Sequence, residues 1–156
     1  MTSDQIIRIL DLKPYLNGGF FRETHRSELH SLGTMNLIAT SVYYLLTPAA
    51  VSKFYKFSVD MSFHFYCGDP ITWIFLKESG EVEKFVMGSL LEHHQVPQLH
   101  VAASTWVGGF VNPGGSFSLL GIILSPGMDF QNITVADREQ LMTQYAIAEK
   151  YINQLS

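Results

Sequence analysis

Three side chains of this sequence could exchange protons with a bound substrate: Tyr55, His64 and His100. Histidine titrates near neutral pH, so with a second titratable group it can act as a general acid or base. If the segment Phe63-His64-Phe65-Tyr66 forms a strand, His64 points away from both phenylalanines. This alternation favours a structural role for His64, in a backbone hydrogen bond or an interface. For His100 the default interpretation is a core or solvent-facing histidine.

Arg22 and Thr24 follow the Gly18-Gly19 pair in a chain with few charged residues. A guanidinium group is a planar fork that can bind a carboxylate or phosphate group of a ligand. Thr24, on the same strand face, would add a hydroxyl group. The alternative for Arg22 is a salt bridge at a sheet edge or at a dimer interface.

Other reactive residues stand in weaker patterns. Cys67 has no neighbouring base that would make it a nucleophile, and His93-His94 beside Glu92 indicates a surface loop rather than a metal site. The Gly108-Gly109 and Gly114-Gly115 pairs are interpreted as hairpin turns. The sequence contains no phosphate-binding loop, serine elbow or zinc-binding helix motif.

In the middle of the chain, the types of side chain alternate with a period of two residues. Short β-branched and aromatic runs are separated by Gly, Pro and Asn, which is typical of strands joined by turns. The expected strands cover residues 41–46, 54–57, 61–66, 71–76 and 82–87. Because no helical segment lies between them, they predict an antiparallel sandwich or barrel rather than a parallel α/β sheet.

Both ends of the chain carry a helical pattern. Thr2 and Gln5 stand at capping-box spacing before a short helix that ends before Pro14. Near the other end, Thr134 and Asp137 precede apolar residues at steps of three and four. That apolar stripe consists of Leu141, Tyr145, Ala148, Ile152 and Leu155. We expect one helix at each end.

The composition limits the class of protein. Of 156 residues 47% are apolar, and 14 acidic against 10 basic residues give a net charge of −4. Such a chain forms a single domain, 1–156, and has no basic stripe for nucleic acid. One cysteine, no secretory signal and no apolar run of about 20 residues indicate a cytoplasmic protein that does not enter a membrane.

Four stretches of the sequence, taken in order, carry a family resemblance. They are residues 18–24 with Arg26-Ser27, residues 52–54, residues 63–66 with 68–70, and residues 125–130. In these stretches the chain resembles the uncharacterised cupin-5 (DUF985) family. The resemblance implies a mainly β fold, the cupin jelly-roll barrel, with a central pocket and usually in a homodimer. It favours a pocket position for Arg22, but a fold shared by many activities does not fix the function.

The sequence departs from the wider cupin superfamily where that superfamily binds metal. Tyr55 stands at the first histidine position, Phe57 at the second ligand position, Met61 at the acidic position and Val107 at the last histidine position. Divalent ions in proteins are bound by imidazole, carboxylate or thiolate groups, and these side chains offer none of them. We therefore predict no metal site and no cofactor.

The resemblance and the alternation together suggest what faces the barrel interior. Tyr55, Phe57, Met61 and Phe63 are expected on the interior face. They either line a pocket for a flat or apolar ligand or fill the barrel, as side chains of small barrels usually do. Filling is favoured for Phe57, and both possibilities stay open for Tyr55 and Met61.

A second set of candidates is expected along one face of the following strands: Gln98, His100, Ser104 and Trp106. Gln98 matches a glutamine of the family and would donate and accept hydrogen bonds inside the barrel. Trp106 would offer a surface on which a ligand can stack.

These residues support two main hypotheses. In the first, a metal-independent cupin isomerises, epimerises or cyclises a small sugar-like or apolar cyclic molecule, with Tyr55, His64 and His100 as acid-base groups. In the second, a non-catalytic binding or sensing protein orients its ligand through Arg22, Gln98 and Trp106. A metal-dependent oxygenase ranks last. A homodimer is expected because an open jelly roll must cover its sheet edges.

Overall fold

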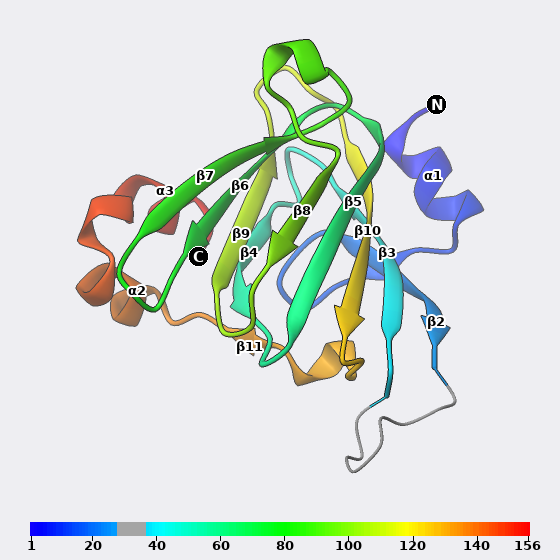
Figure 1. Cartoon of the computed structure of the whole chain (residues 1–156). Coiled ribbons are helices and arrows are strands. Elements are labelled where there is room, and N and C mark those ends of the chain that lie inside the picture. The colour runs from blue at the N-terminus through cyan, green and yellow to red at the C-terminus, as the bar shows by residue number, and fades with distance from the viewer. Residues whose placement is uncertain (28–36) are drawn as a thin grey trace.

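A computed structural model describes residues 1–27 and 37–156 of the chain (Figure 1). Two antiparallel sheets face each other, and short helices lie at both ends of the chain. The six-stranded sheet runs in the order β1 (Lys13–Pro14), β2 (Phe20–Arg26), β3 (Thr40–Leu46), β10 (Ser118–Ser125), β5 (Asp60–Gly68) and β8 (Gln98–Val101). The five-stranded sheet runs β11 (Thr134–Val135), β4 (Ser52–Lys56), β9 (Trp106–Val111), β6 (Ile71–Leu76) and β7 (Val82–Met87).

The strands expected from the alternating pattern are confirmed as β3 to β7. Successive strands do not always pair: β3 and β4 belong to different sheets, and β10 lies between β3 and β5. This order is that of a jelly roll, with the residues of alternate positions facing the space between the sheets.

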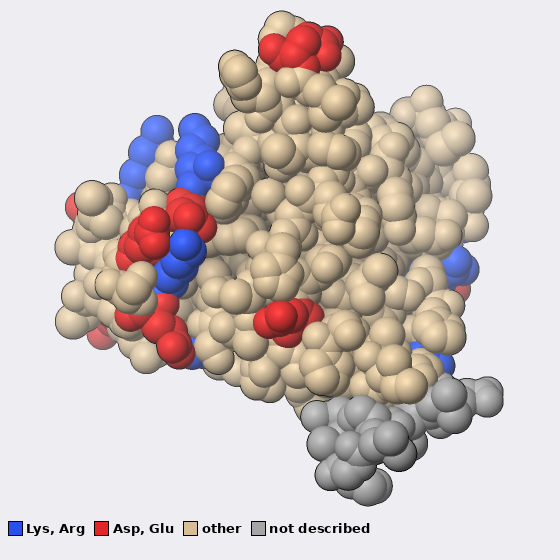
Figure 2. Space-filling model, viewed as in Figure 1, with Lys and Arg blue, Asp and Glu red and all other residues tan. Residues whose placement is uncertain are grey.

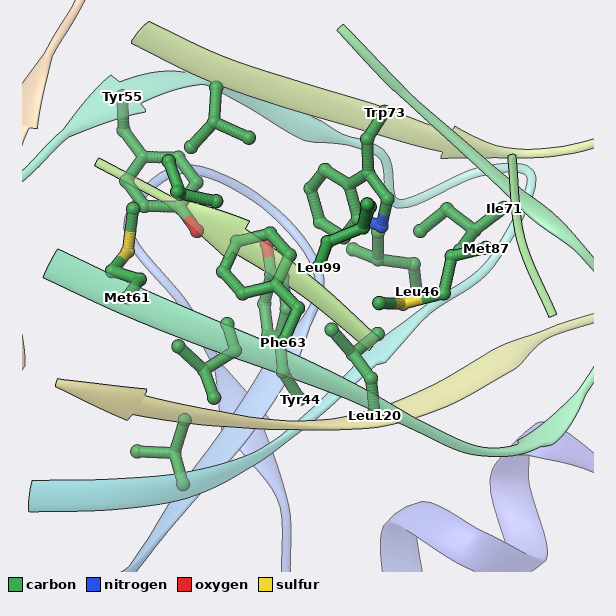
Figure 3. Packing of buried hydrophobic residues seen from close by; sticks show 14 of the residues in the cluster. Tyr44, Leu46, Tyr55, Met61, Phe63, Ile71, Trp73, Met87, Leu99 and Leu120 are labelled. Carbon is green, nitrogen blue, oxygen red and sulfur yellow. The ribbon is translucent and has the colours of Figure 1, made fainter. Parts of the chain in front are cut away.

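That space is filled by one cluster of buried side chains, seen from close by in Figure 3. Tyr44, Tyr55, Met61, Phe63 and Trp73 all point into it, and none is more than 1% exposed. The interior candidates therefore face the same space, Tyr55 from β4 of one sheet and Met61 and Phe63 from β5 of the other. They are packed together as a core, which is the usual state of a small barrel.

The N-terminal helix α1 (Ser3–Ile9) begins with the predicted capping box. The Gln5 backbone N–H donates to Thr2 Oγ1 at 3.3 Å, and the Thr2 N–H donates to Gln5 Oε1 at 2.9 Å. The helix buries Ile6 against Leu45 and Leu119, on the outer face of the six-stranded sheet. It covers only this part of the face and leaves Tyr66 of β5 and Ile123 of β10 exposed.

The C-terminal segment forms α2 (Arg138–Gln144) and α3 (Glu149–Gln154) rather than one helix. All five residues of the predicted stripe are buried, and they pack on Phe54, Ile74 and Trp106 of the five-stranded sheet. The helical conformation stops at Tyr145, with φ −129° and ψ 53°, where the hydroxyl group donates to the Lys77 carbonyl at 2.9 Å. The helix breaks at a tertiary contact, which the periodicity of the sequence could not predict.

Three 3₁₀ turns complete the described elements: η1 (Leu91–His93), η2 (Phe130–Asn132) and η3 (Ala146–Ala148). η1 is exposed and carries His93, in agreement with the predicted surface loop. The prediction of a hairpin turn at Gly108-Gly109 is wrong, because both residues lie inside β9. A Cβ at Gly109 would lie 2.7 Å from Trp73 Cζ3, so the bulky indole ring requires glycine there. Gly114, with φ +87°, lies in a turn, but this turn leads from β9 to β10 in the other sheet, so the predicted hairpin is not formed there either.

Candidate functional site

The acid-base candidates lie in two different places. Tyr55 is inside the barrel, with its ring edge-on to Phe57 at a centroid distance of 5.8 Å. His64 and His100 lie on the outer face of the six-stranded sheet, opposite Gly121 and Ser62 in the strand registers. The sheet itself separates the phenol from both imidazoles, so these three groups do not form one site.

The interior phenols are held in their neutral form. Burial raises the pKa of Tyr55 well above its usual range, and the nearby phenols of Tyr44 and Tyr15 raise it further. Burial likewise raises the pKa of Tyr44 and of Tyr15. Tyr44 donates to the Gly18 carbonyl at 2.9 Å, and Tyr15 to the Phe130 carbonyl at 2.6 Å. A neutral phenol can donate a hydrogen bond but is not a base at neutral pH.

Gln98 lies outside the barrel, which corrects the expected interior position. Its side chain is exposed next to His64 on β5, whereas Leu99 and Val101 of the same strand are buried inside. His100 is also exposed, and its Nε2 lies 3.8 Å from a carboxylate oxygen of Asp60. The apolar residues of β8 occupy the core, and the polar residues of the same strand therefore lie on the outer face.

Ser104 and Trp106 do not continue the face of Gln98, which is a second correction. Residues 102–105 carry the chain from β8 in one sheet to β9 in the other, so the alternation starts anew. Ser104, at φ +65°, donates its N–H to the Phe57 carbonyl at 2.8 Å. Trp106 packs under the C-terminal helices, with the Lys56 ammonium group 4.5 Å from its ring centroid.

Arg22 lines a surface cavity of about 340 Å³, here named the β2 pocket. The walls come from the segment after α1, from β2, and from the segment after β10. They are formed by Asp11, Lys13, Phe21, Arg22, Glu23, Arg26, Asp129 and Phe130. Phe130 extends from the pocket into the core, where its ring meets Phe57 at 5.7 Å.

Most charges of the β2 pocket are already paired with one another. Arg26 donates through Nε and Nη2 to the two carboxylate oxygens of Glu23, at 2.9 and 2.7 Å, and lies 3.7 Å from Asp129. Lys13 contacts Asp11 at 2.6 Å and lowers the pKa of that carboxyl group. Because of these pairs, the cationic groups of the pocket are already engaged by protein carboxylates, with one exception.

The exception is Arg22. Its guanidinium carbon lies 5.6 Å from the centre of the Tyr43 ring, and its Nε is buried without a hydrogen-bond acceptor in the described part of the chain. A buried N–H without an acceptor is costly, so Arg22 is the basic residue of this pocket whose hydrogen-bonding capacity the described protein atoms leave unfilled. Thr24 is not part of the pocket wall; it sits at a bulge of β2 and contacts Ser41 at 3.0 Å.

Two stretches that carry the family resemblance meet in this pocket. Residues 18–24 with Arg26-Ser27 supply β2, and residues 125–130 supply Asp129 and Phe130, about a hundred positions later. Sequence reasoning singled out Arg22 and missed the other lining residues. The signal that could have found them is that both stretches carry the family resemblance. In the structure they come close because β2 and β10 pair with the two sides of β3.

The family model described as Cupin superfamily (DUF985), Cupin_5, matches residues 4–136. The chain belongs to this family. Two solved structures resemble this cupin over its whole length. A hypothetical protein from Leishmania major is 25% identical with a TM-score of 0.91, covering 100% of this chain and 99% of its own. A protein from Shewanella oneidensis is 29% identical with a TM-score of 0.92, covering 100% and 98%.

More distant cupins share the fold alone. Oxalate decarboxylase from Bacillus subtilis, which has Mn(II) centres, is 13% identical with a TM-score of 0.59, over 94% of this chain and 38% of its own. This likeness confirms the predicted jelly-roll fold. No curated protein gives a significant match to the sequence.

The residues expected at the superfamily's metal positions lack the donor groups that a metal ion needs. Tyr55, Phe57, Met61 and Val107 are all buried in the apolar core, and the one oxygen among them belongs to a phenol whose pKa is raised. Within residues 1–27 and 37–156, no three His, Cys, Asp or Glu side chains are grouped closely enough to bind a metal. Over the same residues, no helix has the length and hydropathy to cross a bilayer.

Proposed function

We propose that this cupin binds a small organic anion in the β2 pocket, without a metal ion and without changing it chemically. The observation that carries the proposal is Arg22, whose buried Nε lacks an acceptor while the neighbouring Arg26 and Lys13 are paired with carboxylates. A carboxylate or phosphate group is the natural partner of a free guanidinium edge.

The rest of the pocket indicates the body of the ligand. Phe21 and Phe130 offer apolar wall, and the carboxylates of Glu23 and Asp129 can accept hydrogen bonds from hydroxyl groups. A sugar-like acid carries both features. Such a molecule would place its acidic group on Arg22 and its hydroxyl groups toward the two carboxylates.

Binding is favoured over isomerisation, epimerisation or cyclisation by the positions of the titratable groups. Tyr55 is buried in the core, and His64 and His100 are on the other side of the sheet. A general acid and a general base must both reach one substrate, within about 3 Å of the protons they move. The β2 pocket contains none of the three.

The test measures binding of D-glucuronate, as a sugar-like acid, by calorimetry and by recovery of the ligand. We expect saturable binding that persists after treatment with a chelator, is weakened about tenfold in Arg22→Gln, and is absent for glucose. Arg8→Gln, which removes an exposed arginine of α1, is the matched control and should bind normally. Equal affinity in Arg22→Gln, a metal requirement, or recovery of an epimer would each refute the proposal.

We also propose that two copies of the chain pair through the outer face of the six-stranded sheet beyond α1. Tyr66 is 53% and Ile123 37% exposed there, and His64 Nε2 is buried without a hydrogen-bond partner among the described residues. Figure 2 shows almost no charged side chains over β5, β8 and β10, so two such faces can meet without repulsion.

Light scattering tests the pairing. We expect a dimer at micromolar concentration, and a shift to monomer in Ile123→Glu, which places a charge on each side of the interface. The exposed Ile147, on the helix side, provides the matched control Ile147→Glu, which should stay dimeric. A monomeric wild-type protein would contradict the proposal.

A further inference from the structure

The outer face of the five-stranded sheet is only partly covered by helices. The C-terminal helices pack on Ile74, Leu76 and Trp106. The next cross-strand row, in which Thr72 pairs with Val86 on one side and Phe110 on the other, lies beyond this contact. Between this row and α3 is a cavity of about 460 Å³, here named the helix groove.

The helix groove is basic and contains no acidic side chain in its wall. Lys84 of β7 stands on one side and Lys150 of α3 on the other. Neither lysine has an ion pair, a hydrogen bond or an aromatic ring as partner among the described residues, whereas Lys77 nearby is held by Glu81 and Glu83. Figure 2 shows basic side chains standing next to each other where β7 and α3 meet. Two unpaired ammonium groups across one cavity attract an anion.

A third polar group is fixed at one end of the groove. The Thr72 hydroxyl, on a residue only 3% exposed, donates to Asn112 Oδ1 at 2.6 Å. The Asn112 backbone is itself held by a bond from its N–H to the Pro70 carbonyl at 2.9 Å. Because the amide oxygen is engaged by Thr72 and Asn112 lines the groove, its amide nitrogen keeps both hydrogens for another acceptor.

The remaining wall is aromatic. Phe110 contributes to the floor and Tyr151 to the α3 side, and both are partly exposed. Rings of this kind offer flat apolar surface at little cost in conformational entropy, and a ligand ring can stack on them. The groove thus combines two cations, one oriented amide donor and an aromatic surface.

We propose that the helix groove binds a small aromatic anion, with the anionic group between Lys84 and Lys150 and the ring against Phe110 and Tyr151. An aryl phosphate has this chemistry. The site lies on the opposite sheet from the β2 pocket and does not depend on the function proposed there.

The test titrates the full chain with 1-naphthyl phosphate and follows backbone amide signals by NMR. Saturable shifts are expected at Thr72, Phe110 and Asn112, and much weaker binding is expected for 1-naphthol and for inorganic phosphate alone. The double variant Lys84→Met, Lys150→Met should bind about tenfold more weakly or worse, because it loses both charge-assisted contacts. Lys53→Met removes an exposed lysine of β4 and should bind as the wild type.

Several outcomes overturn the proposal. These are an absence of saturation at millimolar probe, shifts confined to the β2 pocket, or equal affinity in the wild type and the double variant. If the double variant folds poorly, Lys150→Met alone and the loss of affinity with added salt give the same test, because attraction between exposed charges is screened. Failure of D-glucuronate binding at Arg22 leaves this result unaffected, and the reverse also holds.

Discussion

The β2 pocket and the helix groove are of similar size, about 340 and 460 Å³, yet their charges are arranged in opposite ways. In the β2 pocket Lys13 and Arg26 are paired with carboxylates of the protein, which leaves Arg22 as the basic group without a direct salt bridge in the described structure, although its charge also lowers the pKa of Asp11. In the groove Lys84 and Lys150 face a wall without carboxylates. Whether a basic side chain can receive a ligand therefore depends on its neighbours, because a protein carboxylate competes for the same donors.

The largest expected effect concerns the phenols of the barrel core, which line neither of the two cavities. Burial raises the pKa of Tyr15, Tyr44 and Tyr55, so between their unfolded and folded pKa values only the unfolded chain ionises. Their contribution to stability is complete below about pH 10 and is lost as the pH rises, by about 1.4 kcal/mol per phenol per pH unit. The free energy of unfolding should thus fall by up to about 4 kcal/mol per pH unit.

Urea unfolding from about pH 9 to about pH 11 measures this slope. Tyr55→Phe should make the slope shallower by about 1.4 kcal/mol per pH unit, the contribution of one phenol, because the ring stays and the ionising group is removed. Equal stability across the whole range would contradict the buried, neutral state of these phenols.

The next effect compares the two faces of β9. A Cβ at Gly109 would lie 2.7 Å from Cζ3 of the buried Trp73, whereas at Gly108 it would lie 3.0 Å from Phe54 Cδ1 and 3.1 Å from Leu155 Cδ1. We expect Gly109→Ala to destabilise the protein by about 1 to 3 kcal/mol in urea unfolding, and Gly108→Ala by less. The reverse order would mean that the helix layer, not the barrel, is the more tightly packed.

A smaller effect on stability is expected when a paired cation is removed, and none when an unpaired cation is removed. Arg26→Met removes a bidentate contact to Glu23 and the approach to Asp129, and should cost about 1 kcal/mol or less because the pair is partly exposed. Lys84→Met removes no contact and should leave the unfolding midpoint unchanged. The difference between the two variants should shrink in high salt. A larger loss in Lys84→Met would show that the groove lysine has a structural partner.

The smallest effect is the pKa of a single carboxyl group. Lys13 lowers the pKa of Asp11 by a hydrogen bond and by its charge. In Lys13→Met the pKa of Asp11 should rise toward its ordinary value, as followed by the carboxyl carbon signal in an NMR titration. Lys53→Met should leave it where it is in the wild type. No change in Lys13→Met would mean that the pair does not persist in solution.

The candidate residues differ in how much of their position could be predicted from the sequence. Arg22 could be selected because a guanidinium group after a Gly-Gly pair belongs to a family stretch. Its environment could not be predicted, because Asp129 and Phe130 reach the pocket from about a hundred residues away. The helix groove carries no motif at all, and Lys84 and Lys150 come together only through the packing of α3 on the sheet.

The sequence alone determined the local features of this protein. The Thr2–Gln5 capping box, the strands β3 to β7 and the apolar stripe before the C-terminus follow from side chains a few positions apart, whose preferences act before any tertiary contact forms. Only the tertiary structure decided that Gln98 points outward, that Trp106 lies under the helices, and that Gly108-Gly109 continues a strand. Each depends on which sheet a strand joins and which large ring packs on it, and both are set by contacts between residues distant in the chain.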